Sequence, residues 1–215
     1  MNQKRAALPV AKEGFPFIAI AVFVTVILGI FSLKLPALLA LFVTLFIVYF
    51  FRNPEREVPE EQDAVLAPAD GVIIYLGKAH EEHLDDEMLK VSIFMSVFNV
   101  HVNRVPFSGR VIDIFYKRGK FLDARDDKAT FENEQSGIIV ETDKGLKLVF
   151  VQVAGLIARR IVSYPAKGDF LTRGDRYGLI RFGSRVDVYL PKNTDMRVSI
   201  GSKTTAGETV LGCLK

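Results

Sequence analysis

The sequence predicts a mainly β (α+β) protein, in which a barrel-sandwich-like soluble domain follows a hydrophobic helical membrane hairpin. Three observations lead to this class. Two long apolar runs fill the first quarter of the 215 residues, short β-rich runs recur in the rest, and glycine-bearing turns repeat near the C-terminus. We therefore expect a membrane hairpin at 1–52, a linker at 53–63 and one soluble domain at 64–215.

The expected hairpin consists of the apolar runs 15–33 and 35–51, each near the roughly twenty residues that cross a bilayer. Basic residues precede the first run and follow the second, with only Lys34 between, so the positive-inside bias favours a cytoplasmic soluble domain. No small-residue cleavage site follows the first run, which argues against a signal peptide. Because Pro36 stands where a helix starts or breaks, a shallow hairpin in one leaflet is an alternative to a spanning one.

The soluble part is expected to be built from short strands between glycine, aspartate and lysine turns. The acidic segment 80–87, which holds His80 and His83, is expected to be a solvated loop. The expected strands lie at 71–77, 89–94, 109–116, 137–142, 146–153 and 185–190.

A glycine-turn pattern occurs at 167–178 and again at 200–212. Glycines punctuate short strands at similar spacing there, as in the small barrel-sandwich domains that carry lipoyl or biotinyl groups. This supports a rival function, a membrane-tethered carrier or adaptor without chemistry of its own. Carrier domains commonly present a lysine beside a methionine, and no Met-Lys pair occurs in this sequence, so the carrier function ranks lower.

Composition excludes some function classes. The formal net charge of +3 suits work beside anionic lipid and is too small to argue for nucleic-acid binding. Cys213 is the single cysteine, so an intramolecular disulfide is ruled out, in agreement with a reducing compartment. The three histidines lack ligand spacing, so we expect no metal site.

Three segments of the soluble part place polar residues where chemistry is conceivable. Asp70 precedes a strand beside a glycine, in Pro-Ala-Asp-Gly-Val-Ile at 68–73. His101 lies in an apolar stretch and is followed by Arg104, and Gly155 precedes two adjacent arginines. Taken alone, the first two features are more typical of an Asp-Gly turn and a hydrogen-bonded core histidine, and the third is also compatible with a bulged strand.

A fourth segment contains the bond between Gly183 and Ser184, which lies between two strand-forming stretches. Glycine tolerates the strained backbone that would let the serine hydroxyl reach the preceding carbonyl, which makes this bond a candidate for self-cleavage. Taken alone, the dipeptide is more typical of an ordinary turn. A second pair, Gly201 and Ser202, lacks the preceding phenylalanine and lies in the repeated turn pattern, which favours cleavage at the first pair.

In order and spacing, the four segments together resemble the phosphatidylserine decarboxylases, from about residue 66 to the C-terminus. The matching motifs are Pro-Ala-Asp-Gly-Val-Ile, Ser-x4-His-x4-Pro, Val-Ala-Gly-x-Ile-x-Arg-x-Ile and Phe-Gly-Ser. A membrane-associated lipid enzyme also explains the apolar hairpin. The short chain and its Phe-Gly-Ser are similar to the small class of this family, because the longer class has Leu-Gly-Ser-Thr.

The resemblance implies that Ser184 becomes a pyruvoyl group when the chain cuts itself into 1–183, the β chain, and 184–215, the α chain. The ketone would form a Schiff base with the amine of phosphatidylserine, and loss of CO2 would give phosphatidylethanolamine. The implied partners are this substrate, membrane lipid and the two chains as a heterodimer. A higher oligomer and the ether-linked archaeal substrate, archaetidylserine, remain open.

The resemblance also implies roles for the polar residues. Asp70 matches the aspartate of a charge-relay trio in the longer class, and His101 matches a histidine associated with decarboxylation. The relay histidine of that class falls on Arg104, which stays protonated and is a poor general base. We therefore expect Arg104 to pair with Asp70 or to polarise the scissile carbonyl, and His101 to shuttle the proton.

Three further residues are candidates for substrate binding. Gly155, Arg159 and Arg160 lie in the third motif, and the arginines are suited to the lipid phosphate. Surface or structural arginines are an equal alternative.

Overall fold

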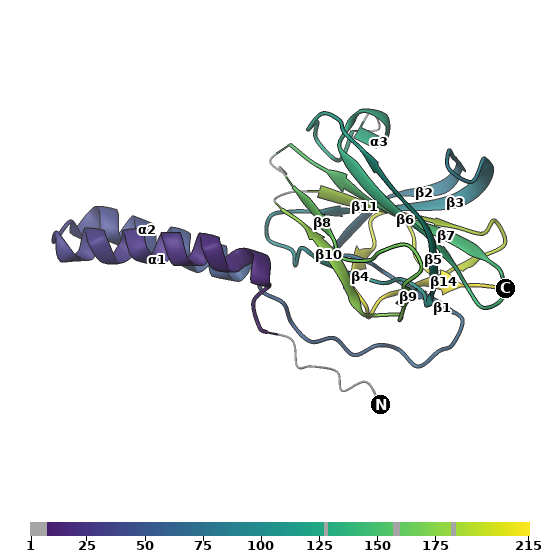
Figure 1. The fold of residues 1–215 in the computed structure, drawn as a ribbon, viewed down its shortest axis with the longest axis horizontal. Helices are drawn as coiled ribbons and strands as arrows, with labels where there is room; N and C mark the ends of the chain where they lie inside the picture. Colours follow the sequence, from purple (N-terminus) through teal and green to yellow (C-terminus); the bar gives the residue numbers. More distant parts are fainter. Residues whose placement is uncertain (1–7, 127–128, 157–159, 182–183) are drawn as a thin grey trace. The chain divides into compact units, whose positions relative to one another are not determined.

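The computed structural model describes residues 8–126, 129–156, 160–181 and 184–215 (Figure 1). The chain forms two compact units, Met1–Glu55 and Arg56–Lys215. The expected linker residues from Arg56 onward belong to the second unit. The Arg173 guanidinium holds several of them by donating hydrogen bonds to the carbonyls of Pro59, Glu61, Gln62 and Ala64.

The first unit is a helical hairpin made of α1 (Phe15–Ile30) and α2 (Lys34–Phe50), after a short 3-10 turn, η1 (Lys12–Gly14). Thr25 and Thr44 meet across the helices with their hydroxyl oxygens 3.0 Å apart. Each hydroxyl also bonds to the carbonyl one turn earlier, so both polar groups are satisfied within the pair.

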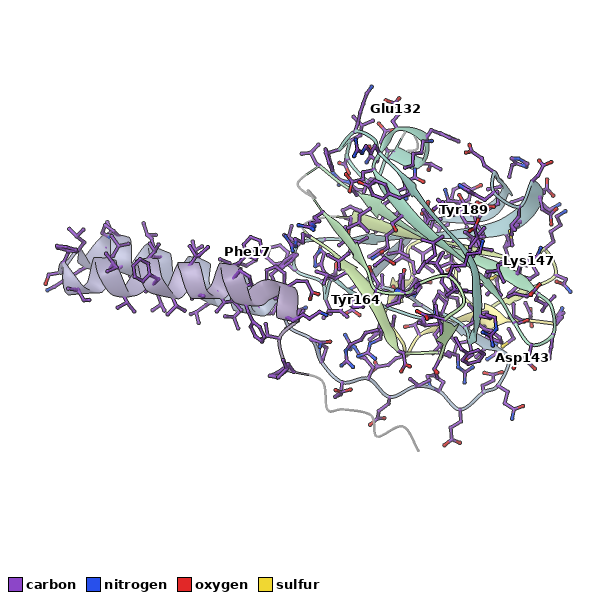
Figure 2. All side chains as sticks on the ribbon, in the orientation of Figure 1. Phe17, Glu132, Asp143, Lys147, Tyr164 and Tyr189 are labelled. Carbon is purple, nitrogen blue, oxygen red and sulfur yellow. The ribbon has the colours of Figure 1, made fainter. Side chains whose placement is uncertain are left out.

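The hairpin exposes apolar side chains around its circumference, as Figure 2 shows for the region labelled at Phe17. Among the described residues, α1 has no buried side chain. The segment Lys12–Ile30 is long and apolar enough to cross a bilayer, and α2 is somewhat shorter. Insertion of the hairpin into a membrane stays a prediction.

The second unit confirms the expected mainly β fold. All pairings between its strands are antiparallel in the described part of the chain, and α3 (Ala129–Glu132) is its one helix there. A curled sheet of eight strands forms one wall, and two sheets of three strands complete the structure (Figure 1). The large sheet has the order β13 (Lys203–Thr204), β2 (Gly71–Glu81), β3 (Asp86–Met95), β11 (Ser184–Leu190), β7 (Lys147–Ala154), β6 (Gln135–Glu141), β5 (Gly109–Lys117) and β9 (Phe170–Leu171). The small sheets are β4 (Val102–Arg104), β10 (Arg176–Ile180) and β8 (Ile161–Ser163), and β1 (Ala64–Leu66), β14 (Val210–Cys213) and β12 (Asp195–Met196).

The six expected strands are confirmed with small shifts of their ends, whereas the expected loop at 80–87 is wrong. His80 pairs with Glu87 in a hairpin of β2 and β3, and only 82–85 lies outside the two strands. Glu81 is 4% exposed and accepts hydrogen bonds from its own turn. Opposite charges face each other across the hairpin, so this acidic segment is compatible with a strand pair.

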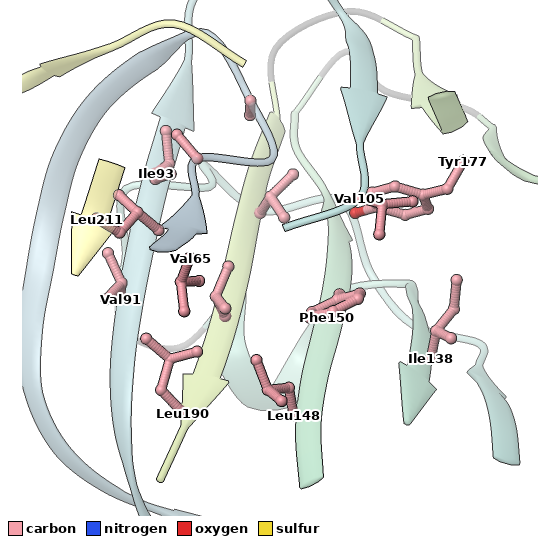
Figure 3. Packing of buried hydrophobic residues seen from close by; sticks show 14 of the residues in the cluster. Val65, Val91, Ile93, Val105, Ile138, Leu148, Phe150, Tyr177, Leu190 and Leu211 are labelled. Carbon is pink, nitrogen blue, oxygen red and sulfur yellow. The ribbon is translucent and has the colours of Figure 1, made fainter. Parts of the chain in front are cut away.

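Strand alternation separates two faces of the large sheet. In β11, Ser184 lies on the side of Val186, Val188 and Leu190, which pack into the main core shown in Figure 3. The intervening residues of β11 face the opposite side of the sheet. This alternation places the Ser184 side chain inside the protein.

The two edges of the large sheet are built alike. β9 lies at one edge and β13 at the other, and each is flanked by two glycines six residues apart. The second glycine of each pair donates its N–H to a carbonyl just before a proline, from Gly174 to Val105 and from Gly207 to Ala67. All four glycines have positive φ: Gly168 95°, Gly174 84°, Gly201 88° and Gly207 77°. The repeated glycine turns of the sequence are therefore two equivalent corners of the fold.

Candidate active site

Ser184 opens β11 and lies between Met95 of β3 and Ala154 of β7. Its side chain is 0% exposed, and its hydroxyl oxygen has no hydrogen-bond partner among the residues that the structure describes. Leaving a buried polar group without a hydrogen bond costs about 1–3 kcal/mol. Such groups are therefore rare in folded proteins, and a catalytic role is one explanation for them. The expected partner in cleavage, Gly183, lies outside the described residues.

His101 is buried, with 2% of its surface exposed, and precedes β4. Its Nδ1 lies 3.0 Å from the carbonyl oxygen of Asn99. A carbonyl can only accept, so Nδ1 carries the proton and Nε2 holds the lone pair of the neutral ring. The Asn99 side chain in turn accepts hydrogen bonds from the backbone and hydroxyl of Ser96, which fixes this turn.

Backbone contacts place His101 at the same end of the sheets as the start of β11. The N–H of Ile180 donates to the His101 carbonyl at 3.4 Å, and Ile180 also pairs with Ile161 of β8. Gly155 follows directly after Ala154, the residue that pairs with Ser184.

Arg160 is exposed at this end, and its carbonyl accepts a hydrogen bond from the N–H of Arg181 at 3.2 Å. Arg159 lies outside the described residues. The structure thus brings Ser184, His101, Gly155 and Arg160 to one end of the protein.

Asp70 lies at one of the two equivalent corners. Its Oδ1 accepts a hydrogen bond from the backbone of Ala206 at 2.8 Å, just before Gly207. At the other corner, Ser108 accepts in the same way from the backbone of Arg173, just before Gly174. Asp70 therefore fixes a turn in the same way as Ser108. Its side chain is a charged carboxylate, whereas that of Ser108 is a neutral hydroxyl.

Asp70 is also paired with Arg56, whose Nη2 lies 3.1 Å from Oδ1 and 2.9 Å from Oδ2. The sequence does not predict this contact, because Arg56 lies in the expected linker at 53–63. β3 separates β2 from β11, so Asp70 lies on the order of 10 Å from Ser184 by strand spacing.

Arg104 is 5% exposed and donates from Nη1 to the carbonyl of Gly174 at 2.8 Å. Its aliphatic stem passes over Gly207, where an added Cβ would lie 2.7 Å from Arg104 Cδ and 3.8 Å from Arg56 Cβ. Arg104 therefore links the two corners through its side chain, next to the pair of Asp70 and Arg56.

A buried ionic cluster occupies the opposite face of the large sheet. Asp187 lies 2.8 Å from Arg185 Nε and 3.0 Å from Lys90 Nζ. Burial disfavours the charged form of Asp187, but the two cations outweigh this effect and lower the pKa of its carboxyl group. Arg185 also donates to Thr130, so the cluster ties β11 to the segment around α3.

A cavity of about 350 Å³ opens on that face and is lined in part by Lys90, Arg185, Tyr75 and Tyr189, the last labelled in Figure 2. It lies across the sheet from the Ser184 side chain, as strand alternation requires. In the described part of the chain, no group of three or more histidine, cysteine or acidic residues is arranged to hold a metal ion.

Two buried amides also lie near Ser184, and the motifs of the sequence did not indicate either of them as a site residue. Gln152 of β7 is 1% exposed and Asn103 of β4 is 0% exposed. Gln152 Nε2 donates to Asn103 Oδ1 at 2.8 Å. A polar residue in an otherwise apolar strand, as in Val-Gln-Val at 151–153, was the one available hint.

Comparison with known proteins gives a consistent result. The family model described as phosphatidylserine decarboxylase matches residues 43–212. The phosphatidylserine decarboxylase proenzyme of Geotalea uraniireducens is 66% identical over 206 residues, covering 96% of this chain and 97% of the relative. The proenzymes of the same name from Geobacter metallireducens and Geobacter sulfurreducens are 66% and 64% identical, each with the same coverage.

Proposed function

The chain belongs to the phosphatidylserine decarboxylase family, and we propose that it is a proenzyme that cuts itself between Gly183 and Ser184 to form its own pyruvoyl group. The observation that carries this proposal is Ser184 itself. Its hydroxyl is fully buried at the start of a central strand and has no hydrogen-bond partner among the described residues. A serine buried in this way is available as an internal nucleophile.

The proposed cleavage proceeds in three steps. The Ser184 hydroxyl oxygen attacks the Gly183 carbonyl, the C–N bond breaks, and the nitrogen takes up the proton to leave an ester and a free amine. A base then removes the Cα proton of Ser184, and the Cβ–O bond breaks to release the Gly183 carboxylate. Water hydrolyses the resulting dehydroalanine to a ketone and ammonia.

We assign the proton transfers to His101. The hydrogen bond from Nδ1–H to Asn99 leaves Nε2 of the neutral ring as the basic atom. This proton shuttle acts at the end of the protein where β11 begins. Its contribution to cleavage, decarboxylation or both remains a proposal.

The surroundings of Ser184 fit a prosthetic group made from this residue. The hydroxyl is an orphaned buried polar atom among the described residues, and the small residue Ala154, which ends the neighbouring strand, pairs with Ser184 and is followed by Gly155. When formed, the pyruvoyl group supplies a carbonyl that condenses with the substrate amine and accepts the electron pair left by departing CO2. In the uncut chain, the full burial of Ser184 shields its hydroxyl from bulk solvent.

Asp70 and Arg104 are proposed as positioning residues of the cleavage site. The contacts of Asp70 with Ala206 and Arg56 support a role in holding the corner on the far side of β3 from Ser184 rather than a direct proton transfer. Two roles are proposed for Arg104. It either pairs with Asp70 or polarises the scissile carbonyl.

We propose that Arg160, together with Gly155 and Arg159, meets the phosphate of the lipid. Support comes from the exposure of Arg160 at the same end as His101. A guanidinium there can donate two parallel hydrogen bonds to phosphate oxygens.

The protein is proposed to act at the cytoplasmic face of the cell membrane. The helical hairpin would insert into the bilayer, and residues 64–215 would form the decarboxylase domain. After cleavage, 1–183 and 184–215 stay together as a heterodimer, because β11 pairs with β3 and β7 on both sides.

Mass spectrometry of the intact purified protein tests this function. Two chains, with a C-terminal fragment that begins at position 184 and has a blocked, ketone-bearing N-terminus, are expected. A single uncut chain contradicts the proposal, and an uncut chain without decarboxylase activity favours the carrier or adaptor module. Assays with diacyl and ether-linked serine lipids separate the bacterial and archaeal types of substrate.

A further inference from the structure

We infer that Gln152, held in place by Asn103, is a positioning residue that orients the Ser184 hydroxyl for self-cleavage; this inference rests on the proposed function. The inference starts from strand register. Ser184 pairs with Ala154, and Gln152 is two residues away from Ala154 on the same strand. Side chains two residues apart share a face of the sheet, so Gln152 and Ser184 point into the same interior space.

Asn103 spans the strand that Ser184 begins. Its Oδ1 accepts a hydrogen bond from Gln152 Nε2 at 2.8 Å, on the β7 side of β11. Its Nδ2 lies 3.6 Å from the sulfur of Met95, which pairs with Ser184 on the β3 side. The Asn103 amide therefore contacts both strands that flank β11, and its hydrogen bond holds the Gln152 side chain in place.

The orientation of the Gln152 amide follows from its neighbours. Nε2 also lies 3.5 Å from the carbonyl oxygen of Val162, which can only accept, so the nitrogen must face this side. Gly178 leaves the room for it, because an added Cβ there would lie 3.1 Å from Nε2. Oε1 is thereby left as an acceptor, and it has no hydrogen-bond partner in the described part of the chain.

A buried donor and a buried acceptor thus occupy neighbouring positions. The Ser184 hydroxyl can donate a proton in a hydrogen bond, and Gln152 Oε1 can accept it. An amide cannot take the proton away at neutral pH, so Gln152 holds the hydroxyl in one orientation while a base completes the transfer. Satisfying both groups at once removes two desolvation costs and restricts the hydroxyl to a reactive orientation.

The test follows cleavage of pulse-labelled full-length chains, synthesised with lipid vesicles, on a denaturing gel. Gln152→Met has similar volume without polar atoms, and we expect it to cut about 100-fold more slowly than the wild type. Gln152→Glu keeps an acceptor oxygen and should cut faster than Gln152→Met, although a buried carboxyl makes it the less stable of the two. The matched control is Gln135→Met, a buried glutamine on the opposite face of the same sheet, which should cut at the wild-type rate.

The melting temperature of each uncut variant, made in the Ser184→Ala background, separates orientation from folding. If Gln152 has a structural role alone, the cleavage rate should follow the melting temperature. Gln152→Met would then cut at least as fast as Gln152→Glu, and this order would overturn the inference. Wild-type cleavage in Gln152→Met would overturn it equally. An uncut wild-type chain would instead reject the proposed function itself.

Discussion

At the scale of single residues, the account depends on two buried groups, one at the start of β11 and one just before β4. Ser184 offers a hydroxyl without a partner among the described residues, and His101 offers a basic Nε2 because Asn99 occupies Nδ1. Both residues stood out in the sequence through motifs. The burial of Ser184 and the hydrogen bond of His101 to Asn99 are visible only in the folded structure.

The first prediction concerns His101. We expect His101→Ala to slow self-cleavage by about 100-fold or more, because a positioned general base contributes 10²–10⁴-fold. The measurement is the time course of the two-chain pattern on a denaturing gel. His83→Ala, in the β2–β3 hairpin, is the control and should leave the rate unchanged. Unaltered cleavage and turnover in His101→Ala would rule out the assigned proton shuttle.

Some site residues could be predicted from the sequence and others could not. Ser184, His101 and Asp70 lie in recognisable local motifs. The pairing of Asp70 with Arg56 and of Gln152 with Asn103 could not be read from any local pattern, because the second pair joins residues 49 positions apart. The contact between Gln152 and Asn103 arises only after β4 packs against β7.

At the scale of elements, the alternation of side chains along β11 places its residues in two different environments. Its inward residues belong to the core and the candidate site, and its outward residues Arg185 and Asp187 belong to the ionic cluster. The six strands were predictable because β-branched runs between turns have a clear pattern. The hairpin at 80–87 was not, because its acidic composition concealed the cross-strand pairing.

The second prediction concerns the ionic cluster. Asp187→Asn leaves Arg185 and Lys90 buried without their carboxylate, and we expect a loss of about 3 kcal/mol in the free energy of unfolding. The lowered pKa of Asp187 makes its stabilisation complete above the unfolded-state pKa of about 3.9, and this stabilisation is lost as the pH falls through the folded-state value.

Urea unfolding between pH 3 and pH 7 measures both effects. The wild type should lose stability in acid more steeply than Asp187→Asn, so that the difference between them shrinks as the pH falls. A constant difference across this range would contradict the assigned role of the carboxylate. Asp143→Asn, in an exposed turn, is the control.

The third prediction concerns the equivalent corners. Asp70→Ala should lower the free energy of unfolding by about 2 kcal/mol, because the backbone of Ala206 and the guanidinium of Arg56 lose their acceptor. Asp70→Ser should recover part of this loss, since Ser108 holds the other corner with a hydroxyl. Equal unfolding curves for the two variants would show that the corners are not equivalent in energy.

At the scale of the whole molecule, a proposed membrane hairpin is combined with a β unit whose two sheet edges are alike. The short β-rich runs in the sequence were sufficient to predict a mainly β unit, and the repeated glycine spacing corresponds to its two similar sheet edges. The depth of the hairpin was not predictable, because α1 and α2 have 16 and 17 residues, close to the lower limit of a span.

The fourth prediction concerns this hairpin. Ser32→Cys, in a Cys213→Ser background, places one thiol at the helical turn. If the hairpin spans the membrane, an impermeant maleimide should label this thiol in intact cells from the outside. Labelling only after the membrane is opened would indicate a shallow hairpin. A cysteine at Glu57 in the same background, on the proposed cytoplasmic side, is the control for membrane integrity.

The most direct test of the central claim is the intact mass of the purified full-length protein compared with Ser184→Ala. The account predicts two masses for the wild type, one of them residues 184–215 with a pyruvoyl N-terminus, and one uncut mass for the variant. A single uncut chain in an active wild-type preparation, or a fragment that begins at Ser202, would contradict it.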